Sequence, residues 1–376
     1  MTASPTFKAG LEGVVAGTSE ICFIDGREGR LVYAGYDIRD LAEHSSFEEV
    51  VYLLWHRRLP TRAELDQLDA DLKANRALPE PVLAALRTLP RDIHPMAALR
   101  TGVSLLGNFD PEAEATGREA NLRKAIRVTA QMATLTAAWE RIRKGLDPIP
   151  PRTDLSHAAN FLYMLSGKEP DPFFARVFDI ALILHADHEL NASTFSARVT
   201  IATLTDLYSA ITSAVGTLKG PLHGGANEQV MKTLEEIGSI DRVEEWVKEA
   251  LAQKRKIMGF GHRVYKTKDP RAYILERYAE EITRRTGDTK WFEMTRKLEQ
   301  TVLEQKGLYP NVDLYSGCIY TAMGIPTDLF TPIFAVSRVA GWTAHILEQL
   351  ENNRIIRPIA EYVGPQKREY VPIDQR

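Results

Sequence analysis

The sequence has few cysteines, no long apolar run and little excess charge, and each absence argues against a class of protein. Its 376 residues include two cysteines, Cys22 and Cys318, which lie far apart and form no C-x-x-C pair. We therefore expect no disulfide framework. The low cysteine content instead predicts a reducing, cytoplasmic location. No run of about 18 apolar residues occurs, so we expect no membrane-spanning helix.

The charge balance is also unremarkable. The net charge of -3 at pH 7 gives no broad positive surface for nucleic acid or for an anionic membrane. The N-terminal segment MTASPTFKAGLEG lacks the basic and apolar parts of a signal peptide. Hydrophobic residues make up 44% of the chain, and its length is sufficient for two domains. These features predict a soluble intracellular protein that binds neither nucleic acid nor membrane.

Strand patterns are scarce, and helical patterns fill most of the chain. Only residues 13–38, GVVAGTSEICFIDGREGRLVYAGYDI, alternate as strands do, around an Asp-Gly and a Glu-Gly turn, which predicts one short hairpin. Capping boxes at Ser46 and Thr61 predict helix starts. Further helical segments are expected near 121–144, 154–165, 173–188, 201–217, 226–237, 241–254, 271–285, 289–304 and 332–350. The predicted fold class is all-α.

Two segments contain histidines in polar or glycine-rich surroundings. HADHELNAS places His185 and His188 three residues apart, but the order differs from the zinc pattern H-E-x-x-H and no third ligand is near, so no metal site is expected. His185 fits a buried structural histidine, whereas His188 stands in a more polar stretch. GPLHGGAN places His223 between a turn and an expected helix. Alone, this histidine is equally consistent with an ordinary polar turn.

The segment KIMGFGHRVYKTKDPRA, residues 256–272, combines glycines, a histidine and several basic residues. Two glycines precede His262, which allows a close backbone approach to a ligand. The basic residues fit either a solvated loop or an anion-binding loop. The pattern GFGHRV is not a dinucleotide fingerprint, because it follows a helix-like run and lacks the third glycine.

Two further segments place charges among apolar residues. In YPNVDLYSGCIY, Asp313 is interpreted either as a helix N-cap or as a carboxylate whose basicity rises beside an apolar pocket. Arg338 lies within an apolar helix, for which Thr331 is the expected N-cap, and a charge there requires a partner. Arg357 follows this helix and is either exposed or a further ligand.

Five blocks, in this order, together resemble the citrate synthase family: HADHELNAS, GPLHGGANE, IMGFGHRVYKTKDPRA, NVDLYSG and FTPIFAVSRVAGWTAHILEQ…NRIIRP. The similarity extends from about Leu11 to the EYVGP near the C-terminus. It implies a citrate-synthase-like two-domain helical fold with a short N-terminal β-hairpin, assembled as a homodimer. The large domain would comprise residues 1–221 and 325–376, and the small domain residues 222–324. The additional N-terminal β domain of hexameric, NADH-inhibited members has no counterpart in the sequence.

The resemblance also implies a reaction and a set of site residues. Acetyl-CoA would condense with oxaloacetate, and hydrolysis would release citrate and CoA, a step of the tricarboxylic acid cycle that needs no cofactor and no metal. The catalytic triad would be His223, His262 and Asp313. Oxaloacetate would be bound by His188, Arg271 and Arg338, and by Arg357 from the second subunit. CoA would contact Lys256, Ile257, Met258, Gly259, Phe260, Gly261, Arg263, Lys266 and Asn311.

Two alternatives stay open at this point. A 2-methylcitrate synthase has the same blocks and uses propionyl-CoA, which is larger by one methylene, a difference that binding discriminates by only about 1–3 kcal/mol. A non-catalytic helical protein that binds CoA or a carboxylate would be expected to lack a member of the triad. All three members are present in this sequence.

Overall fold

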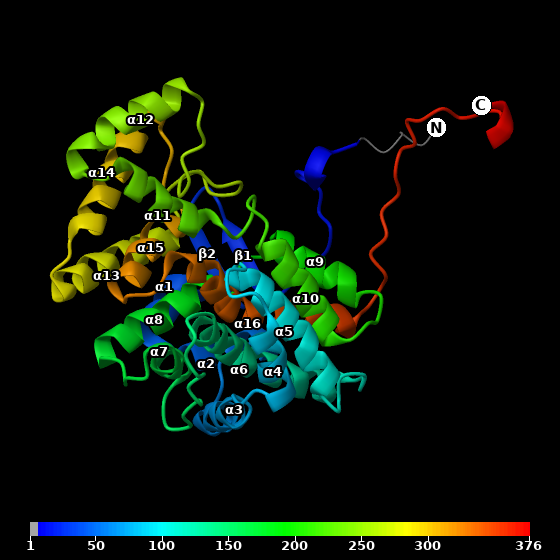
Figure 1. Ribbon diagram of the computed structural model, residues 1–376, viewed down its shortest axis with the longest axis horizontal. Coiled ribbons are helices and arrows are strands. Elements are labelled where there is room, and N and C mark those ends of the chain that lie inside the picture. Colours follow the sequence, from blue (N-terminus) through cyan, green and yellow to red (C-terminus); the bar gives the residue numbers. More distant parts are fainter. Residues whose placement is uncertain (1–6) are drawn as a thin grey trace.

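The computed structural model describes residues 7–376; residues 1–6, which the predicted large domain includes, lie outside the described residues. Helices dominate it, which confirms the all-α prediction (Figure 1). The helices are α1 Ile38–His44, α2 Phe47–His56, α3 Arg62–Ala74, α4 Glu80–Thr88, α5 Pro95–Phe109, α6 Arg118–Arg143, α7 His157–Ser166, α8 Pro172–His185, α9 Ala192–Ile201, α10 Leu207–Leu218, α11 Ala226–Ile237, α12 Val243–Ala252, α13 Pro270–Thr286, α14 Lys290–Lys306, α15 Asp313–Ala322 and α16 Phe330–Glu351.

The predicted hairpin is present as the first two strands of a small antiparallel sheet. Strand β1 (Cys22–Asp25) pairs with β2 (Arg30–Tyr33), with Cys22 opposite Tyr33 and Asp25 opposite Arg30. A third strand, β3 (Tyr36–Asp37), was not predicted, because two residues are too few to show an alternating pattern. The sheet is therefore a local feature of a helical protein.

Helix α16 lies at the centre of the fold. Nearly all of its residues are buried, and it packs against α2, α6, α8, α9 and α10. A helix that is apolar on all sides is expected in such a position, enclosed by other helices. Its two buried titratable side chains, Arg338 and His345, are therefore exceptions that need buried partners.

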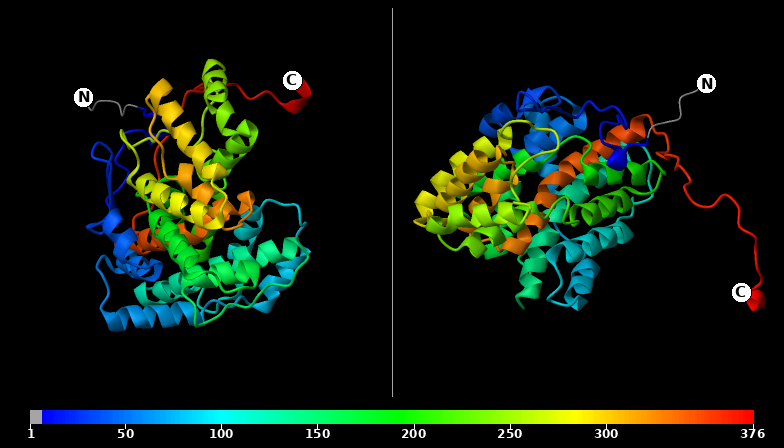
Figure 2. Two further views of the ribbon diagram at one scale, coloured as in Figure 1. Left: turned by 90° about the vertical axis from the view of Figure 1, so that its left-hand side faces the viewer. Right: turned by 90° about the horizontal axis from the view of Figure 1, so that it is seen from above.

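Helices α11 to α15 gather on one side of the molecule, at the upper left of Figure 1 and the top of the left-hand view in Figure 2. They pack mainly on one another: α13 and α11 on α15, and α12 on α14. Helix α13 also contacts α1 and α8. These helices fall within the predicted small domain, 222–324, but the division into domains stays a prediction.

Helix starts follow the predictions in part. Thr61 and Glu64 form the predicted capping box. Ser46 accepts the Glu49 N–H, but the Glu49 carboxylate accepts from Ser45 Oγ instead of completing a box. The prediction that Thr331 caps α16 is wrong, because the helix begins at Phe330. The Thr331 hydroxyl instead donates to Glu228 Oε1 at 2.5 Å.

Boundaries predicted from periodicity were correct for some helices and wrong for others. Helix α11 has the predicted bounds, 226–237. The predicted helix 201–217 is wrong at its start, because α9 ends at Ile201 and α10 begins at Leu207. The intervening ATLTD contains no glycine or proline to mark the break. Helices α1, α4, α5 and α9 were not predicted, and α15 was implied only by the interpretation of Asp313 as a helix N-cap.

The C-terminal segment extends away from the helical body. Residues 352–376 leave the end of α16 as irregular chain, with one short turn at Ile373–Gln375 (Figures 1 and 2). Several large apolar side chains in this segment are exposed, among them Ile355, Ile359, Tyr362, Val363 and Tyr370. Within residues 7–376, no helix is long and apolar enough to cross a membrane.

Candidate active site

Of the seven residues predicted to act in catalysis or to bind oxaloacetate, six line one cavity of about 640 Å³. They come from the segment after α8, the turn before α11, the segment before α13 and its first turn, the first residue of α15, and the middle of α16. The six are His188, His223, His262, Arg271, Asp313 and Arg338. The cavity therefore brings together three histidines, one carboxylate and two guanidinium groups that are up to 150 positions apart in the chain.

His223 is neutral, and its tautomer is fixed by Ser193. The Ser193 backbone N–H donates to Nε2 of His223 at 3.2 Å, and Ser193 Oγ lies 2.8 Å from the same atom. Because Nε2 accepts, the ring proton is on Nδ1. Burial, and then the charge of Arg338, lower the pKa of His223 to about 4. His223 therefore presents a neutral N–H donor.

His262 has the opposite tautomer. Its Nδ1 accepts backbone N–H groups from Val264 at 3.0 Å and Tyr265 at 3.2 Å, so its proton is on Nε2. Burial, followed by the charge of Arg271, lowers the pKa of His262 to about 4. Both rings are therefore neutral at pH 7. Each has one N–H group that makes no hydrogen bond to the residues that fix its tautomer.

Asp313 is not a helix cap, so that interpretation is wrong. Val312 is the N-cap of α15, and Asp313 is its first helical residue, with no capping bond from its side chain. Its Oδ1 is buried and has no hydrogen-bond partner within residues 7–376. Burial raises the pKa of Asp313 to about 6, although Arg271 opposes this shift. The result is a carboxylate that is more basic than usual but still mostly ionised at pH 7.

Arg338 is a buried cation without a carboxylate partner. Its Nε–H donates to the carbonyl of His185 at 2.6 Å, and its guanidinium lies 4.6 Å from the centre of the Phe334 ring. No salt bridge to Arg338 occurs within residues 7–376. Burial lowers the pKa of Arg338 to about 10, although the Asp187 carboxylate opposes this shift, and the lowered value reflects the cost of burying a charge that has no salt bridge. A ligand carboxylate would remove that cost.

Arg271 differs because it already has a partner. Its Nε and Nη2 donate to Asp269 at 3.0 and 2.7 Å, and both side chains are buried. Burial alone would lower the pKa of Arg271, but the Asp269 carboxylate raises it. Asp269 is also the N-cap of α13, with Pro270 at the first helical position. This pair fixes the guanidinium at the cavity wall.

The neighbouring histidines separate as predicted. His185 is buried away from the cavity, with Nδ1 2.7 Å from the Ala181 carbonyl, which confirms that it is structural. His188 lines the cavity, and its Nε2 lies 3.3 Å from the Tyr265 hydroxyl. Burial, together with the charges of Arg271 and His262, lowers the pKa of His188 well below its usual value.

The glycine-rich loop before His262 forms the other end of the cavity. Lys256, Met258, Gly259, Phe260, Gly261, Arg263 and Asn311 line it, whereas Ile257, Lys266 and Arg357 do not. Ile257 is buried, and Lys266 and Arg357 are exposed, the latter in the C-terminal segment. Asn311 joins this loop to the Asp313 segment, because its Nδ2 donates to the Gly261 carbonyl and its Oδ1 accepts from the Asp313 N–H.

Ser193 and Asp269 support the site but were not predicted. Each stands in a quoted block that contains a predicted ligand: Asp269 lies two residues before Arg271, and Ser193 lies five residues after His188. Asn191 is the N-cap of α9, which places Ser193 in the first turn. Trp342 of α16 donates to Ser193 Oγ at 3.1 Å. The missed signal was a Ser or Asp beside a helix start.

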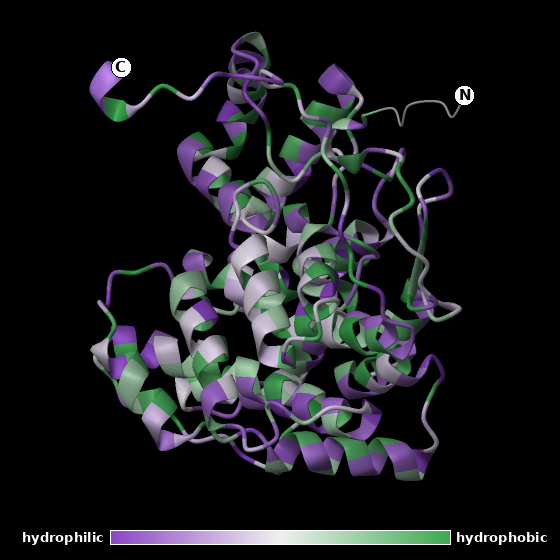
Figure 3. Ribbon diagram, turned by 90° about the vertical axis from the view of Figure 1, so that its right-hand side faces the viewer, coloured by the Kyte–Doolittle hydropathy of each residue, from purple (hydrophilic) through white to green (hydrophobic). Residues whose placement is uncertain are grey.

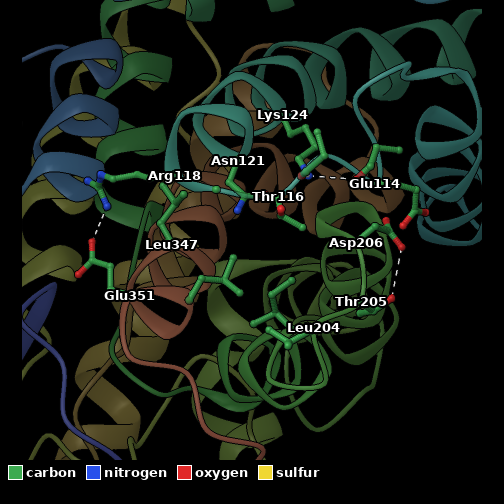
Figure 4. A pocket seen from close by; sticks show the side chains of 15 residues that line it. Glu114, Thr116, Arg118, Asn121, Lys124, Leu204, Thr205, Asp206, Leu347 and Glu351 are labelled. Carbon is green, nitrogen blue, oxygen red and sulfur yellow. Dashed lines mark hydrogen bonds and ion pairs between the residues drawn. The ribbon is translucent and has the colours of Figure 1, made fainter.

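A second cavity, of about 400 Å³, lies between the start of α6, the 202–206 loop and the end of α16 (Figure 4). Its cations are already partnered: Arg118 pairs with Glu351, and Lys124 donates to the carbonyls of Ala113 and Ala115. It contains no histidine. Within residues 7–376, no cluster of three or more His, Cys, Asp or Glu suits a metal ion.

Comparison with known proteins decides the family. The profile described as "Citrate synthase, C-terminal domain" matches residues 10–359. The chain belongs to the citrate synthase family. Citrate synthase 2 of Bacillus subtilis is 55% identical over 372 residues, which cover 99% of this chain and 100% of that protein. The 2-methylcitrate synthase of Shewanella oneidensis is 43% identical, over 98% of each chain.

A solved citrate synthase from Thermoplasma acidophilum has the same fold. Its TM-score is 0.93 at 35% sequence identity, over 99% of this chain and 100% of that one. That structure is a ternary complex with carboxymethyl coenzyme A and oxaloacetate. The cavity described above is therefore found in a chain of the citrate synthase fold and family.

Proposed function

We propose that this protein condenses acetyl-CoA with oxaloacetate and hydrolyses the resulting thioester to citrate and CoA. The observation that carries the proposal is the combination in one cavity of a carboxylate of raised basicity with two neutral histidines that have opposite tautomers. A condensation that begins with proton removal from carbon needs a base and a hydrogen-bond donor for each of two carbonyl oxygens. These three side chains supply that set.

The first step forms the enolate of acetyl-CoA. Asp313 takes a proton from the acetyl methyl group, and the thioester oxygen, which becomes negative, accepts a hydrogen bond from Nδ1–H of His223. Because α11 starts at Ala226, just after His223, its positive end favours both the neutral ring and the developing negative charge. The neutral His223 ring can make this hydrogen bond because its proton is on Nδ1.

The second step joins the two substrates. Nε2–H of His262 donates to the ketone oxygen of oxaloacetate, and the enolate carbon attacks the polarised carbon. The new alkoxide then takes this proton. Arg338 and Arg271, with His188, bind the carboxylates of oxaloacetate, because guanidinium groups match carboxylates in a two-point geometry. Water finally attacks the thioester carbonyl and returns one proton to the His262 ring, and CoA leaves as its thiol with the proton that Asp313 took from the methyl group.

Acetyl-CoA is proposed over propionyl-CoA because relatives named citrate synthase are the more similar ones. The test is free-thiol release from oxaloacetate with each acyl-CoA in parallel. A higher kcat/KM for acetyl-CoA is expected. A preference for propionyl-CoA would transfer the same mechanism to 2-methylcitrate synthesis, and thiol release from neither by folded protein would contradict the proposal.

The active form is proposed to be a homodimer that meets along α9 and α10. The outward residues of these helices carry no charge: Ala192, Phe195, Ser196, Val199, Thr200, Ser209, Thr212, Ser213, Gly216 and Thr217. The one charged residue of either helix, Arg198, is buried and pairs with Glu348. Figure 3, which faces the side where α9 and α10 lie in Figure 1, shows pale ribbons of intermediate hydropathy at its centre. Small uncharged side chains favour close helix packing.

The second subunit is proposed to complete each site with Arg357. This residue lies in the extended segment that leaves the body of its own chain with exposed apolar side chains. Such a segment requires a surface to cover it. Arg357 would provide a third guanidinium for oxaloacetate.

Mixing inactive variants tests this arrangement. Asp313→Asn chains and Arg357→Ala chains, allowed to exchange subunits, are expected to recover part of the wild-type activity, because one site of each heterodimer contains both native residues. Absence of recovery in a sample shown by mass spectrometry to contain heterodimers would mean that each site is built from one chain.

The reaction is proposed to take place in the cytoplasm. Cys22 and Cys318 are both buried free thiols, which fits a reducing compartment.

A further inference from the structure

The N-terminal hairpin provides no group for the proposed chemistry, yet it contacts two of the segments that do. Figure 1 shows β1 and β2 between the α11–α15 group and the rest of the helical body. Ile24 of β1 lines the cavity itself. The turn at one end of the hairpin meets the segment that follows His262, and Tyr33 at the other end meets the segment that precedes His188.

The turn approaches the His262 segment too closely for any side chain larger than glycine. The Gly26 carbonyl accepts the Lys266 N–H at 2.7 Å. A Cβ atom on Gly26 would lie 2.1 Å from the Val264 carbonyl oxygen and 2.7 Å from its carbon. A Cβ atom on Gly29, whose φ is +64°, would lie 2.8 Å from Thr267 Cγ2. The hairpin turn and residues 264–268 therefore fit against each other.

Two hydrogen bonds within the turn hold its conformation. Asp25 Oδ1 accepts N–H groups from Arg27 at 2.9 Å and from Glu28 at 3.0 Å. The same two bonds lower the pKa of Asp25, because they stabilise the ionised carboxylate. The conformation of the turn is thus set within the hairpin.

The supported segment fixes the tautomer of His262. The N–H groups that donate to Nδ1 of His262 belong to Val264 and Tyr265. The Val264 carbonyl lies against Gly26, and the Lys266 N–H donates to the Gly26 carbonyl. Moving this segment away would therefore move both donors and release the ring that presents Nε2–H.

The other end of the hairpin supports His188. The Tyr33 hydroxyl is buried, lies 2.9 Å from the Asp187 carbonyl and accepts the Asp187 N–H at 3.2 Å. Asp187 directly precedes His188, whose ring lies 5.1 Å from that of His262, centre to centre. The two ends of one hairpin thus hold the two histidines that face each other.

We infer that the hairpin is a positioning element for oxaloacetate: it holds the His262 segment through its Gly26 turn and the His188 segment through Tyr33, and so sets the distance between these rings. This inference rests on the proposed function. A displacement on the order of 1 Å at a reacting group can reduce the rate about 100-fold.

Gly26→Ala is the direct test, with Gly17→Ala as its matched control, since a Cβ on Gly17 meets nothing within 4 Å. We expect Gly26→Ala to lower kcat/KM for oxaloacetate at least about tenfold while circular dichroism shows a folded protein, because the His262 segment must move. The control should stay within about twofold of the wild type. A Gly26→Ala enzyme with wild-type kinetics, or one whose loss only matches its unfolded fraction, would overturn the inference.

A second pair keeps the test decisive if Gly26→Ala does not fold. Gly29→Ala is expected to lower kcat/KM, and adding Thr267→Ser, which removes the clashing Cγ2, should restore most of the loss relative to Thr267→Ser alone. Gly35→Ala, at a φ of +94° with nothing within 4 Å of its Cβ, reports the cost of backbone strain by itself. No restoration would contradict the inference. Thiol release by the wild type is measured first, and its absence would instead contradict the proposed function.

Discussion

At the scale of single residues, the candidate site consists of ordinary side chains whose protonation is set by their surroundings. His223 and His262 have the same chemistry in water, but Ser193 donates to Nε2 of one, and Val264 and Tyr265 donate to Nδ1 of the other. The same burial that keeps both rings neutral raises the basicity of Asp313. Burial therefore provides two neutral donors and one base.

The pKa of Asp313 predicts the acid limb of the activity profile. Only the ionised carboxylate accepts a proton, so kcat/KM for acetyl-CoA should fall about tenfold per pH unit below pH 6. The histidines, with pKa values of about 4, should remain neutral across this limb. The measurement is kcat/KM between pH 5 and 8, with circular dichroism to show that the protein stays folded. A kcat/KM that stays constant from pH 7 down to pH 5 would assign the base elsewhere.

At the scale of elements, two helix starts are joined beside the turn that carries His223. Thr331, in the first turn of α16, donates to Glu228 Oε1 at 2.5 Å and also lies 3.3 Å from the Gly224 carbonyl. Glu228 is buried in the first turn of α11, and His94 Nε2 lies 3.4 Å from its second oxygen. The Thr331 hydroxyl therefore connects the first turn of α11 to the first turn of α16 by hydrogen bonding.

Thr331→Val tests this joint. The substitution keeps the shape but removes a donor from a buried carboxylate, so the free energy of unfolding should fall by about 1–3 kcal/mol in urea titrations. Thr88→Val is the control, because the Thr88 hydroxyl bonds only to the Ala85 carbonyl at an exposed position. Its effect should stay within about 0.5 kcal/mol. If both variants lost the same free energy of unfolding, the Thr331–Glu228 hydrogen bond would not be what stabilises the start of α11.

The sequence was informative about helices and about the site, but less so about how helices begin. Glycine and proline marked the bounds of α11 and α13, whereas the break between α9 and α10 contains neither. Thr331 was predicted to cap α16 because capping is local, but its partner Glu228 is 103 positions away. The blocks around His188, His223, His262 and Asp313 identified the cavity. The partners Ser193 and Asp269 needed the three-dimensional structure.

At the scale of the whole molecule, two features bear on assembly: the α9–α10 face and the C-terminal segment. The first has no charged outward side chain, and the second exposes apolar residues along an irregular chain. Both fit a dimer in which each subunit covers the other. Such an assembly cannot be derived from periodicity, because a half-buried serine has the same pattern whether water or a subunit covers it.

Val199→Glu on α9 tests the proposed interface. A carboxylate placed in an uncharged interface must be desolvated without a partner, so the variant should be monomeric by light scattering and should lose most of its activity, since Arg357 would no longer reach a second site. Leu65→Glu on α3, also half-buried but distant from that face, is the control and should stay dimeric. A dimeric, active Val199→Glu protein would place the interface elsewhere.

The most direct test of the account is Asp313→Asn, with turnover and oxaloacetate affinity measured on the same preparation. Turnover should fall by about 100- to 10,000-fold, the usual contribution of a general base, while calorimetric affinity for oxaloacetate changes less than about threefold. Folding raises the pKa of Asp313 from 3.8 to about 6, so stability falls by about 3 kcal/mol as pH rises through this interval, and the uncharged Asn variant should melt higher at pH 7. Near-normal turnover with lost oxaloacetate affinity would contradict the central claim that Asp313 is the base.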